Sequence, residues 1–146
     1  MFCGQRWLGV ITLGNASPTN EELILFVRKW LGLLADGSLE EACAQQDEPN
    51  SYGVLWSPAA ILRAVSEEFG PETVFGRRHP EGPRFSRPDE VSGSGRPSVL
   101  ALADGSGFSV EHDVPLNDTY SDLTAEFTFR RRGARFAFVV QDLHVK

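Results

Sequence analysis

The pattern of apolar and polar positions is most regular near the end of the chain, within Tyr120–Val145. Before an Arg-Arg-Gly sequence in this stretch, every second residue is apolar: Leu123, Ala125, Phe127 and Phe129. The alternation resumes after it with Phe136, Phe138 and Val140. A period of two is typical of half-buried strands, so we predict a long β-hairpin with its turn at Arg132-Gly133. This turn would place Phe129 opposite Phe136 and Phe127 opposite Phe138, with four rings on one face.

Helical spacing replaces this alternation in the first half of the chain. Thr19 and Glu22 have the spacing of a capping box, and apolar residues follow three and four positions apart as far as Asp36-Gly37. We therefore predict a helix from Thr19 to about Ala35, with a wide apolar stripe that packs on the concave side of a sheet. The stripe consists of Leu23, Phe26, Val27, Trp30, Leu31 and Leu34.

Two shorter helices are expected to follow. Ser38 with Glu41 is a second capping-box pattern, and Ser57-Pro58 combines a residue suited to the N-cap with proline at the first helical position. The third helix would end at Gly70-Pro71 and present one apolar face to the core. That face comprises Ile61, Leu62, Val65 and Phe69.

Proline and glycine interrupt both patterns within Pro71–Pro97. We predict that this segment is mostly irregular, with short strands at most around Thr73–Phe75 and Arg84–Ser86. The sequence Ser-Gly-Ser-Gly within it indicates that Val91–Arg96 is its most mobile part. The segment therefore separates a helical first half from a second half made of strands.

A second hairpin is predicted ahead of the C-terminal one. Val99–Ala103 and Gly107–Val114 flank an Asp-Gly-Ser sequence, which is typical of hairpin turns. In the second of these strands, alternation puts His112 on an apolar face, with Glu111 and Asp113 on the opposite face. Helices followed by antiparallel strands are the order of an α+β domain, which is the fold class we predict.

A chain of 146 residues suits one domain, and we assign residues 19–146 to it, with residues 1–18 as an N-terminal arm or extension. The apolar run Trp7–Leu13 is too short to span a membrane, and a single Arg ahead of it is a poor start for a signal peptide. A cytoplasmic protein with no membrane contact is therefore expected. Cys3 and Cys43 fit either two reduced thiols or one disulfide.

The net charge of the chain is −6, and the acidity is concentrated in Met1–Gly70, which carries four basic and nine acidic side chains. Pro71–Pro97 carries five basic and four acidic side chains, and Ser98–Lys146 carries five and seven. Phosphate contacts require clustered Lys and Arg, so this balance argues against a nucleic-acid partner and favours a basic protein. One short basic cluster lies at the predicted C-terminal turn, Arg130–Arg132 with Arg135.

The order helix, short helix, helix and antiparallel strands resembles that of NTF2-like domains, a superfamily with cone-shaped α+β folds. The sequence FVRKWLGLLADGSLEEA at Phe26–Ala42 is similar to the opening of many such domains. SDLT at Ser121–Thr124 and DLHV at Asp142–Val145 resemble the closing sequences of a group of bacterial domains. The resemblance covers Asn20–Lys146. Bacterial members include immunity proteins of toxin systems, as well as isomerases, dehydratases and cyclases, so the resemblance implies a fold more than a function.

Ser121, Asp142 and His144 form the first candidate site. In the expected register Ser121 faces His144 across the hairpin, and Asp142 lies two residues along on the same face. Together the three could support nucleophilic or general-base chemistry. The alternative is structural, since buried polar groups at the end of a hairpin usually bond to loop backbone. No nucleophile elbow or oxyanion-hole motif accompanies them, and no equivalent of the Tyr–acid pocket of ketosteroid-isomerase-type members is visible, which favours the structural interpretation.

His112 is the second candidate, as one polar group in an apolar cavity. Glu111 and Asp113 would face away from it, so the three do not converge on a metal ion, and His79 has no ligand at suitable spacing. We therefore expect no metal and no cofactor. The sequence Gly93–Arg96 does not lie between a strand and a helix, as a phosphate-binding loop requires, and we interpret it as a flexible loop.

The basic turn is the third candidate. Arg130 would lie opposite Arg135, and like charges directly across a strand pair are unfavourable. Either the side chains splay into solvent, or Arg130, Arg132 and Arg135 bind acidic groups of a partner or of this protein.

These observations favour a non-catalytic binding protein, in particular an immunity-type protein that neutralises a toxin by direct binding. The acidic first half would attract a basic toxin, and the candidate contacts are Glu40, Glu41, Glu67 and Glu68. The alternative is a small-molecule enzyme or ligand-binding protein that uses the cone cavity. Its polar groups would be Ser121, Asp142, His144 and His112. A homodimer is compatible with both interpretations.

Overall fold

The computed structural model describes residues 18–68 and 83–145. Its elements are α1 Asn20–Ala35, α2 Leu39–Ala44, α3 Pro58–Glu68, the 3-10 turn η2 Pro88–Glu90, β1 Ser98–Ala101, β2 Gly107–Leu116, β3 Thr119–Arg132 and β4 Arg135–Val145. This order confirms the predicted α+β class. The expected N-terminal arm up to residue 17, Phe69, the helix end at Gly70-Pro71, the short strand Thr73–Phe75 and His79 lie outside the described residues.

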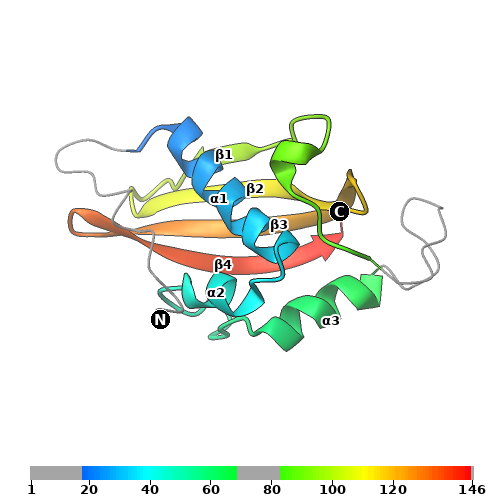
Figure 1. The fold of residues 1–146 in the computed structure, drawn as a ribbon. Helices are drawn as coiled ribbons and strands as arrows, with labels where there is room; N and C mark the ends of the chain where they lie inside the picture. The colour runs from blue at the N-terminus through cyan, green and yellow to red at the C-terminus, as the bar shows by residue number, and fades with distance from the viewer. Residues whose placement is uncertain (1–17, 69–82, 146) are drawn as a thin grey trace.

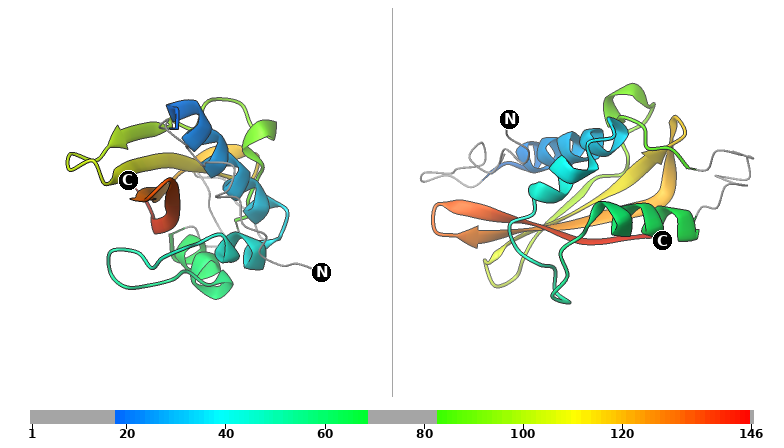
Figure 2. Two further views of the ribbon diagram at one scale, coloured as in Figure 1. Left: turned by 90° about the vertical axis from the view of Figure 1, so that its left-hand side faces the viewer. Right: turned by 60° about the horizontal axis from the view of Figure 1, so that its bottom comes forward.

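The four strands form one antiparallel sheet in the order β1-β2-β3-β4. Helix α1 lies across one face of the sheet, and α3 lies beside the edge strand β4 (Figure 1). The views in Figure 2 show that α1 and the loop after η2 are on the same side of the twisted strands. The sheet is therefore open, with one face covered by α1.

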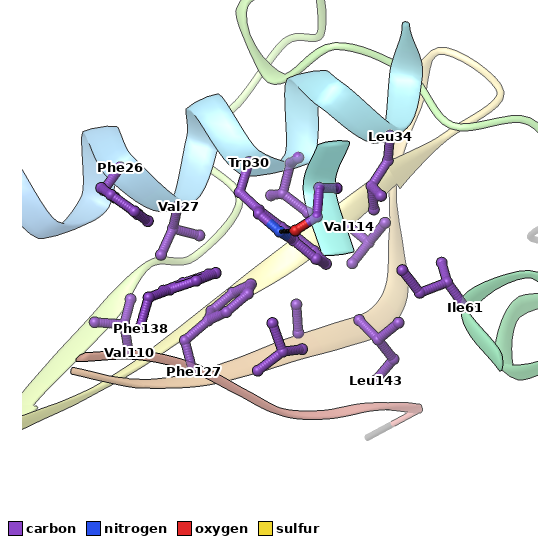
Figure 3. Close-up of a cluster of buried hydrophobic side chains, with 14 of the residues drawn as sticks. Phe26, Val27, Trp30, Leu34, Ile61, Val110, Val114, Phe127, Phe138 and Leu143 are labelled. Carbon is purple, nitrogen blue, oxygen red and sulfur yellow. Dashed lines mark hydrogen bonds between the residues drawn. The ribbon is translucent and has the colours of Figure 1, made fainter. Parts of the chain in front are cut away.

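The core lies between α1 and the inner face of the sheet (Figure 3). Trp30 meets Phe127 edge to face, with ring centroids 5.3 Å apart, and Phe26 meets Phe129 in the same way at 5.4 Å. The indole Nε1 of Trp30 also donates to Ala42 O at 2.8 Å, which fixes α2 against α1. The predicted shared face of the hairpin is confirmed, because all four rings are buried: Phe127, Phe129, Phe136 and Phe138.

The register of this hairpin differs from the prediction by two residues. The turn consists of Gly133-Ala134, one residue later than expected, so Phe129 lies opposite Phe138 and Phe127 opposite Val140. A shift of two residues keeps every side chain on its face, because the side-chain period of a strand is two. The predicted pairs are therefore wrong although the predicted face is right.

A β-bulge in β4 changes the faces beyond this point. Glu126 pairs with Asp142, and the next residue, Phe127, pairs with Val140. Gln141 therefore has no pairing partner in β3 and is an extra residue in β4. One extra residue turns each following side chain to the opposite face. Asp142 and His144 consequently lie on the outer face of the sheet, away from α1.

The predicted helix starts hold in two of three cases. Glu22 N donates to Thr19 Oγ1 at 3.1 Å and Thr19 N donates to Glu22 Oε1 at 2.7 Å, which completes the capping box of α1. Ser57 Oγ accepts from Ala60 N at 3.1 Å and caps α3. The capping box predicted at Ser38 is wrong, because its side chain makes no capping hydrogen bond. The hydrogen bond from Trp30 Nε1 to Ala42 O holds α2 against α1 without a side-chain cap.

The apolar face of α3 is narrower than predicted. Ile61 and Val65 are buried in the core, but Leu62 is half exposed. Successive helical residues are about 100° apart, so only one of Ile61 and Leu62 can face the core directly. Leu62 is therefore an exposed apolar side chain where the sequence predicted one that faces the core.

Candidate functional site

The structure separates Ser121 from Asp142 and His144. The Ser121 hydroxyl is buried, donates to Val114 O at 2.6 Å and accepts from Leu123 N at 3.1 Å. Asp142 Oδ2 and His144 Nδ1 are 3.2 Å apart on the outer face, where both side chains are partly exposed. The predicted grouping is therefore wrong, and the cause is the bulge that turns the end of β4. Ser121 satisfies backbone groups, as the structural alternative expected.

His112 is at the centre of a polar cluster formed by β2, α1, the start of β3 and the loop Val91–Arg96, called the glycine loop below. Its ring is fully buried. Arg28 Nε on α1 donates to Nε2 at 3.0 Å, so the ring proton is on Nδ1, which donates to Asp113 O at 2.8 Å. Tyr120 packs beside the ring, with centroids 5.9 Å apart. Both ring nitrogens of His112 are thus occupied within the protein.

Three polar contacts hold the glycine loop over this cluster. Arg28 Nη2 donates to Ser94 O at 2.5 Å, and Asp113 N donates to Gly95 O at 2.8 Å. Arg96 Nε lies 2.7 Å from Asp113 Oδ2, and the Asp113 carboxylate is almost fully buried. The part of the chain that we predicted to be most mobile is therefore bonded to both α1 and β2.

Gly95 allows the loop to approach the cluster closely. A Cβ at this position would lie 2.3 Å from His112 Cε1 and 2.8 Å from Tyr120 Cε1. The backbone φ of Gly95 is +74°, a conformation that favours glycine. The Ser-Gly-Ser-Gly sequence thus marks a close backbone approach rather than a flexible loop.

A shallow pocket of about 360 Å³ opens between the glycine loop and β3. The hydroxyl of Tyr120 is buried at its edge and has no hydrogen-bond partner among the described residues. Burial raises the pKa of Tyr120, so this hydroxyl stays protonated at neutral pH and is a donor with no acceptor among the described residues. The pocket is lined by Ser92, Gly93, Ser94, Gly95, Arg96, Asp113, Tyr120, Ser121 and Asp122.

The cluster does not present a free base next to a nucleophile. Burial lowers the pKa of His112, and the charge of Arg28 lowers it further, whereas the Asp113 carbonyl and carboxylate partly oppose the shift. Its neutral ring has no nitrogen left for a substrate, and Asp113 is engaged by Arg96. Within residues 18–68 and 83–145, no three His, Cys, Asp or Glu side chains gather so as to hold a metal ion.

The buried neutral histidine should make stability depend on pH. In the unfolded chain His112 titrates near its ordinary pKa of about 6.5, and in the folded protein it titrates lower. The unfolded state therefore binds the extra proton first, and the free energy of unfolding should fall as pH decreases below about 6.5. Urea denaturation across this range, compared between the wild type and His112→Gln, should show a smaller slope in the variant. Equal slopes would contradict this role of His112.

The sequence indicated His112 but not its partners Arg28 and Tyr120. Arg28 lies on α1 beside the buried Val27, and nothing in helical spacing connects it to a strand that begins far along the chain. Tyr120 precedes the alternating part of β3 and was interpreted only as the start of a hairpin. The paired glycines before Arg96 were the signal available, since glycine in a short polar sequence also marks close backbone approach.

The basic turn binds an acidic residue of the protein itself. Arg132 Nε and Nη2 each lie 2.7 Å from a carboxylate oxygen of Glu48, and Arg130 Nη1 lies 3.6 Å from Glu48 Oε1. The hydrogen bonds from Arg132 lower the pKa of Glu48, and the charge of Arg130 adds to this shift. Arg132, not Arg130, lies opposite Arg135 in the register. The predicted pairing of Arg130 with Arg135 is therefore wrong. Both alternatives for the side chains occur, since Arg130 and Arg132 contact an acidic group of the protein itself and Arg135 is exposed to solvent.

The acidic candidates lie on the two short helices. Glu40 on α2 and Glu67 on α3 are exposed, and Glu41 is half-buried. Glu68 is the last residue of α3, and its side chain lies outside the described part of the chain. Residues 18–68 carry nine acidic and three basic side chains, so the helical half has a net charge of −6.

In the part of the chain that the structure describes, no helix combines the length and the apolar composition needed to cross a membrane. Comparison of the chain with protein-family models, with curated proteins and with solved structures found no match.

Proposed function

We propose that this chain is a non-catalytic binding protein, NTF2-like in fold, whose partner is a basic protein. The observation that carries the proposal is the filled inner face of the sheet, where the cone cavity expected of a small-molecule-binding member of this fold would lie. Trp30 is fully buried there and contacts Phe127 and Phe138 at centroid distances of 5.3 and 6.2 Å. A site for small molecules needs an open apolar concavity with a few convergent polar groups, and side chains occupy that space.

The polar candidates support the same proposal. The buried His112 and Ser121 make their hydrogen bonds within the protein, and His144 lies on the opposite face. A nucleophile and a base within hydrogen-bonding reach of each other are the minimum for acyl transfer or general-base chemistry. Among the three, no such pair exists in this geometry.

The helical half supports the choice of a basic partner. Its net charge of −6 over residues 18–68 attracts positively charged proteins and accelerates their association. The resemblance of Ser121–Thr124 and Asp142–Val145 to bacterial domains suggests a more specific form, in which the partner is a toxin that this protein blocks.

Reversing the charge of the acidic helices should slow association. The partner is isolated from the native host with the tagged full-length protein, purified, and mixed with wild type and with the triple variant Glu40→Lys, Glu41→Lys and Glu67→Lys. We expect the association rate constant at low salt to fall at least about tenfold and to lose most of its salt dependence, because steering between exposed charges is screened by salt.

A matched control changes the same number of charges on other elements, with Asp89→Lys, Glu90→Lys and Asp122→Lys, all exposed in the wild type. This control should associate at close to the wild-type rate. If both variants slow association equally, net charge alone is responsible. If neither slows it, the acidic helices are not involved.

A second candidate function is ligand binding at the pocket beside the glycine loop. The observation in its favour is the buried Tyr120 hydroxyl, which has no partner among the described residues and can donate to a bound molecule. The triple variant with reversed charges on α2 and α3 should bind such a ligand with the same affinity as the wild type. The two candidates therefore differ in the outcome of one experiment.

A further inference from the structure

The connection between α2 and α3 presents three large side chains to solvent within four residues. Tyr52 is 87% exposed, and Val54 and Leu55 are about half exposed. We call residues 50–55 the display loop. Single exposed apolar residues such as Leu25 and Leu100 occur on most proteins, but a run of them in one loop is unusual.

The display loop has a fixed backbone. Asn50 Oδ1 accepts from Tyr52 N at 2.9 Å and from Val54 N at 3.0 Å. The backbone closes the same turn, since Asn50 N donates to Val54 O at 2.9 Å and Gly53 N donates to Asn50 O at 2.9 Å. These hydrogen bonds thus restrict the backbone conformation of the turn that carries Tyr52.

The sheet holds the loop through the bulge residue of β4. Asn50 Nδ2 donates to Gln141 O at 3.1 Å, and both Ser51 N and Ser51 Oγ bond to Gln141 Oε1, at 3.0 and 3.1 Å. Gln141 Nε2 in turn donates to Thr128 Oγ1 on β3 at 3.0 Å. The extra residue in β4 therefore provides the anchor for the display loop.

A second anchor lies at the other end of the loop. Gln46 Oε1 accepts from Trp56 N at 2.8 Å, and Gln46 Nε2 donates to Trp56 O at 2.8 Å. Trp56 packs against the core, so the segment after Leu55 is fixed as well. A braced loop loses little conformational entropy on binding, which is the condition under which an exposed tyrosine contributes strongly to affinity.

The charges of the chain segment that carries the display loop indicate the chemistry of its occupant. Between Leu39 and Glu68 the chain carries six acidic side chains and one basic side chain, Arg63. Glu48 is paired with Arg132, yet the exposed acids of α2 and α3 remain on both sides of the loop in the chain. A second copy of this acidic segment would be repelled, whereas a basic protein would gain both apolar burial and charge pairing.

We infer that the display loop is the docking site for the basic protein partner, with Tyr52 inserted into an apolar recess on that partner and Val54 and Leu55 packed around it. This inference rests on the proposed function, because it assigns the place where that binding occurs. Exposed acids on the flanking helices then act mainly on the rate of encounter, and the loop on the lifetime of the complex.

The test places a photo-reactive benzoylphenylalanine at Tyr52 of the full-length protein in the native host. The control carries the same group in place of Leu100, a large side chain that is 66% exposed on β1. Cross-linking from position 52 and not from position 100 should yield one basic polypeptide. That polypeptide is then purified, and its Kd is measured for wild type, Tyr52→Ala and Leu100→Ala.

Tyr52→Ala should raise Kd at least about tenfold, chiefly through faster dissociation, and Leu100→Ala should change it less than about threefold. The inference is overturned if Tyr52→Ala binds as tightly as wild type, if both positions cross-link equally, if position 52 gives no adduct, or if it cross-links only to a second copy of this chain. When the purified partner still binds and depends on the acidic helices, these outcomes reject the display loop and leave the proposed function in place.

Discussion

Phe127→Ala should lower the free energy of unfolding by about 3–5 kcal/mol, the range for removing a large aromatic side chain from a well-packed core. The Phe127 ring is fully buried and lies between α1 and β4. It stacks on Phe138 at a centroid distance of 5.5 Å and meets Trp30 edge to face at 5.3 Å. Its removal leaves a cavity between a rigid helix and the middle of the sheet, where neighbouring side chains cannot close in fully.

Urea denaturation gives the measurement, with Phe108→Ala as the matched control. Phe108 is a ring of the same size on β2 that is only partly buried and meets Phe136 at 5.8 Å. Its replacement should cost clearly less than that of Phe127. Equal losses for the two variants would show that Phe127 is not at the centre of the core.

The face of the C-terminal hairpin was predictable, but its register was not. Alternation with a period of two assigns each side chain to a face, and the burial of Phe127 and Phe138 agrees with it. Register depends instead on which two residues form the turn. Gly133 adopts a φ of +66°, and a turn of Gly133-Ala134 was as compatible with the sequence as one at Arg132-Gly133.

The bulge explains why the first candidate site was wrong. No glycine or proline marks the extra residue at Gln141. The signal in the sequence is that the apolar positions change from even numbers, up to Val140, to odd numbers at Leu143 and Val145. The extra residue makes its contacts far away in the sequence, since Gln141 bonds to Asn50 and Ser51 of the display loop. Alternation counted onward from Val140 assigned Asp142 and His144 to the inner face, and the extra residue turned them to the outer face.

The cluster around His112 was missed for a similar reason. Alternation placed His112 correctly on the apolar face of β2. Its hydrogen bond from Arg28 joins positions separated by 84 residues, and no periodicity relates a helix position to a strand position at such a distance. The half-buried Arg28 ties α1 to the sheet through His112 and to the glycine loop through Ser94 O, and these two contacts restrict how α1 lies on the sheet.

Gly95→Ala should be almost as damaging as the core substitution, with a loss of about 2–5 kcal/mol in the free energy of unfolding. Two effects add. The φ of +74° is unfavourable for any residue with a Cβ, and that Cβ would overlap His112 Cε1 and Tyr120 Cε1 at 2.3 and 2.8 Å. The His112 ring is held by hydrogen bonds at both nitrogens and cannot move aside, so the loop has to lift away.

Gly93→Ala separates the two effects, because Gly93 also has a positive φ, of +98°, but its Cβ would meet Tyr120 at an ordinary distance of 3.7 Å. It should cost about 1–2 kcal/mol from backbone strain alone. Lifting the loop would also break the bond between Asp113 N and Gly95 O, so the Asp113 amide should exchange faster with solvent in Gly95→Ala than in Gly93→Ala. If the two variants lose the same stability and protect this amide equally, the close approach of Gly95 to His112 does not hold the glycine loop in place.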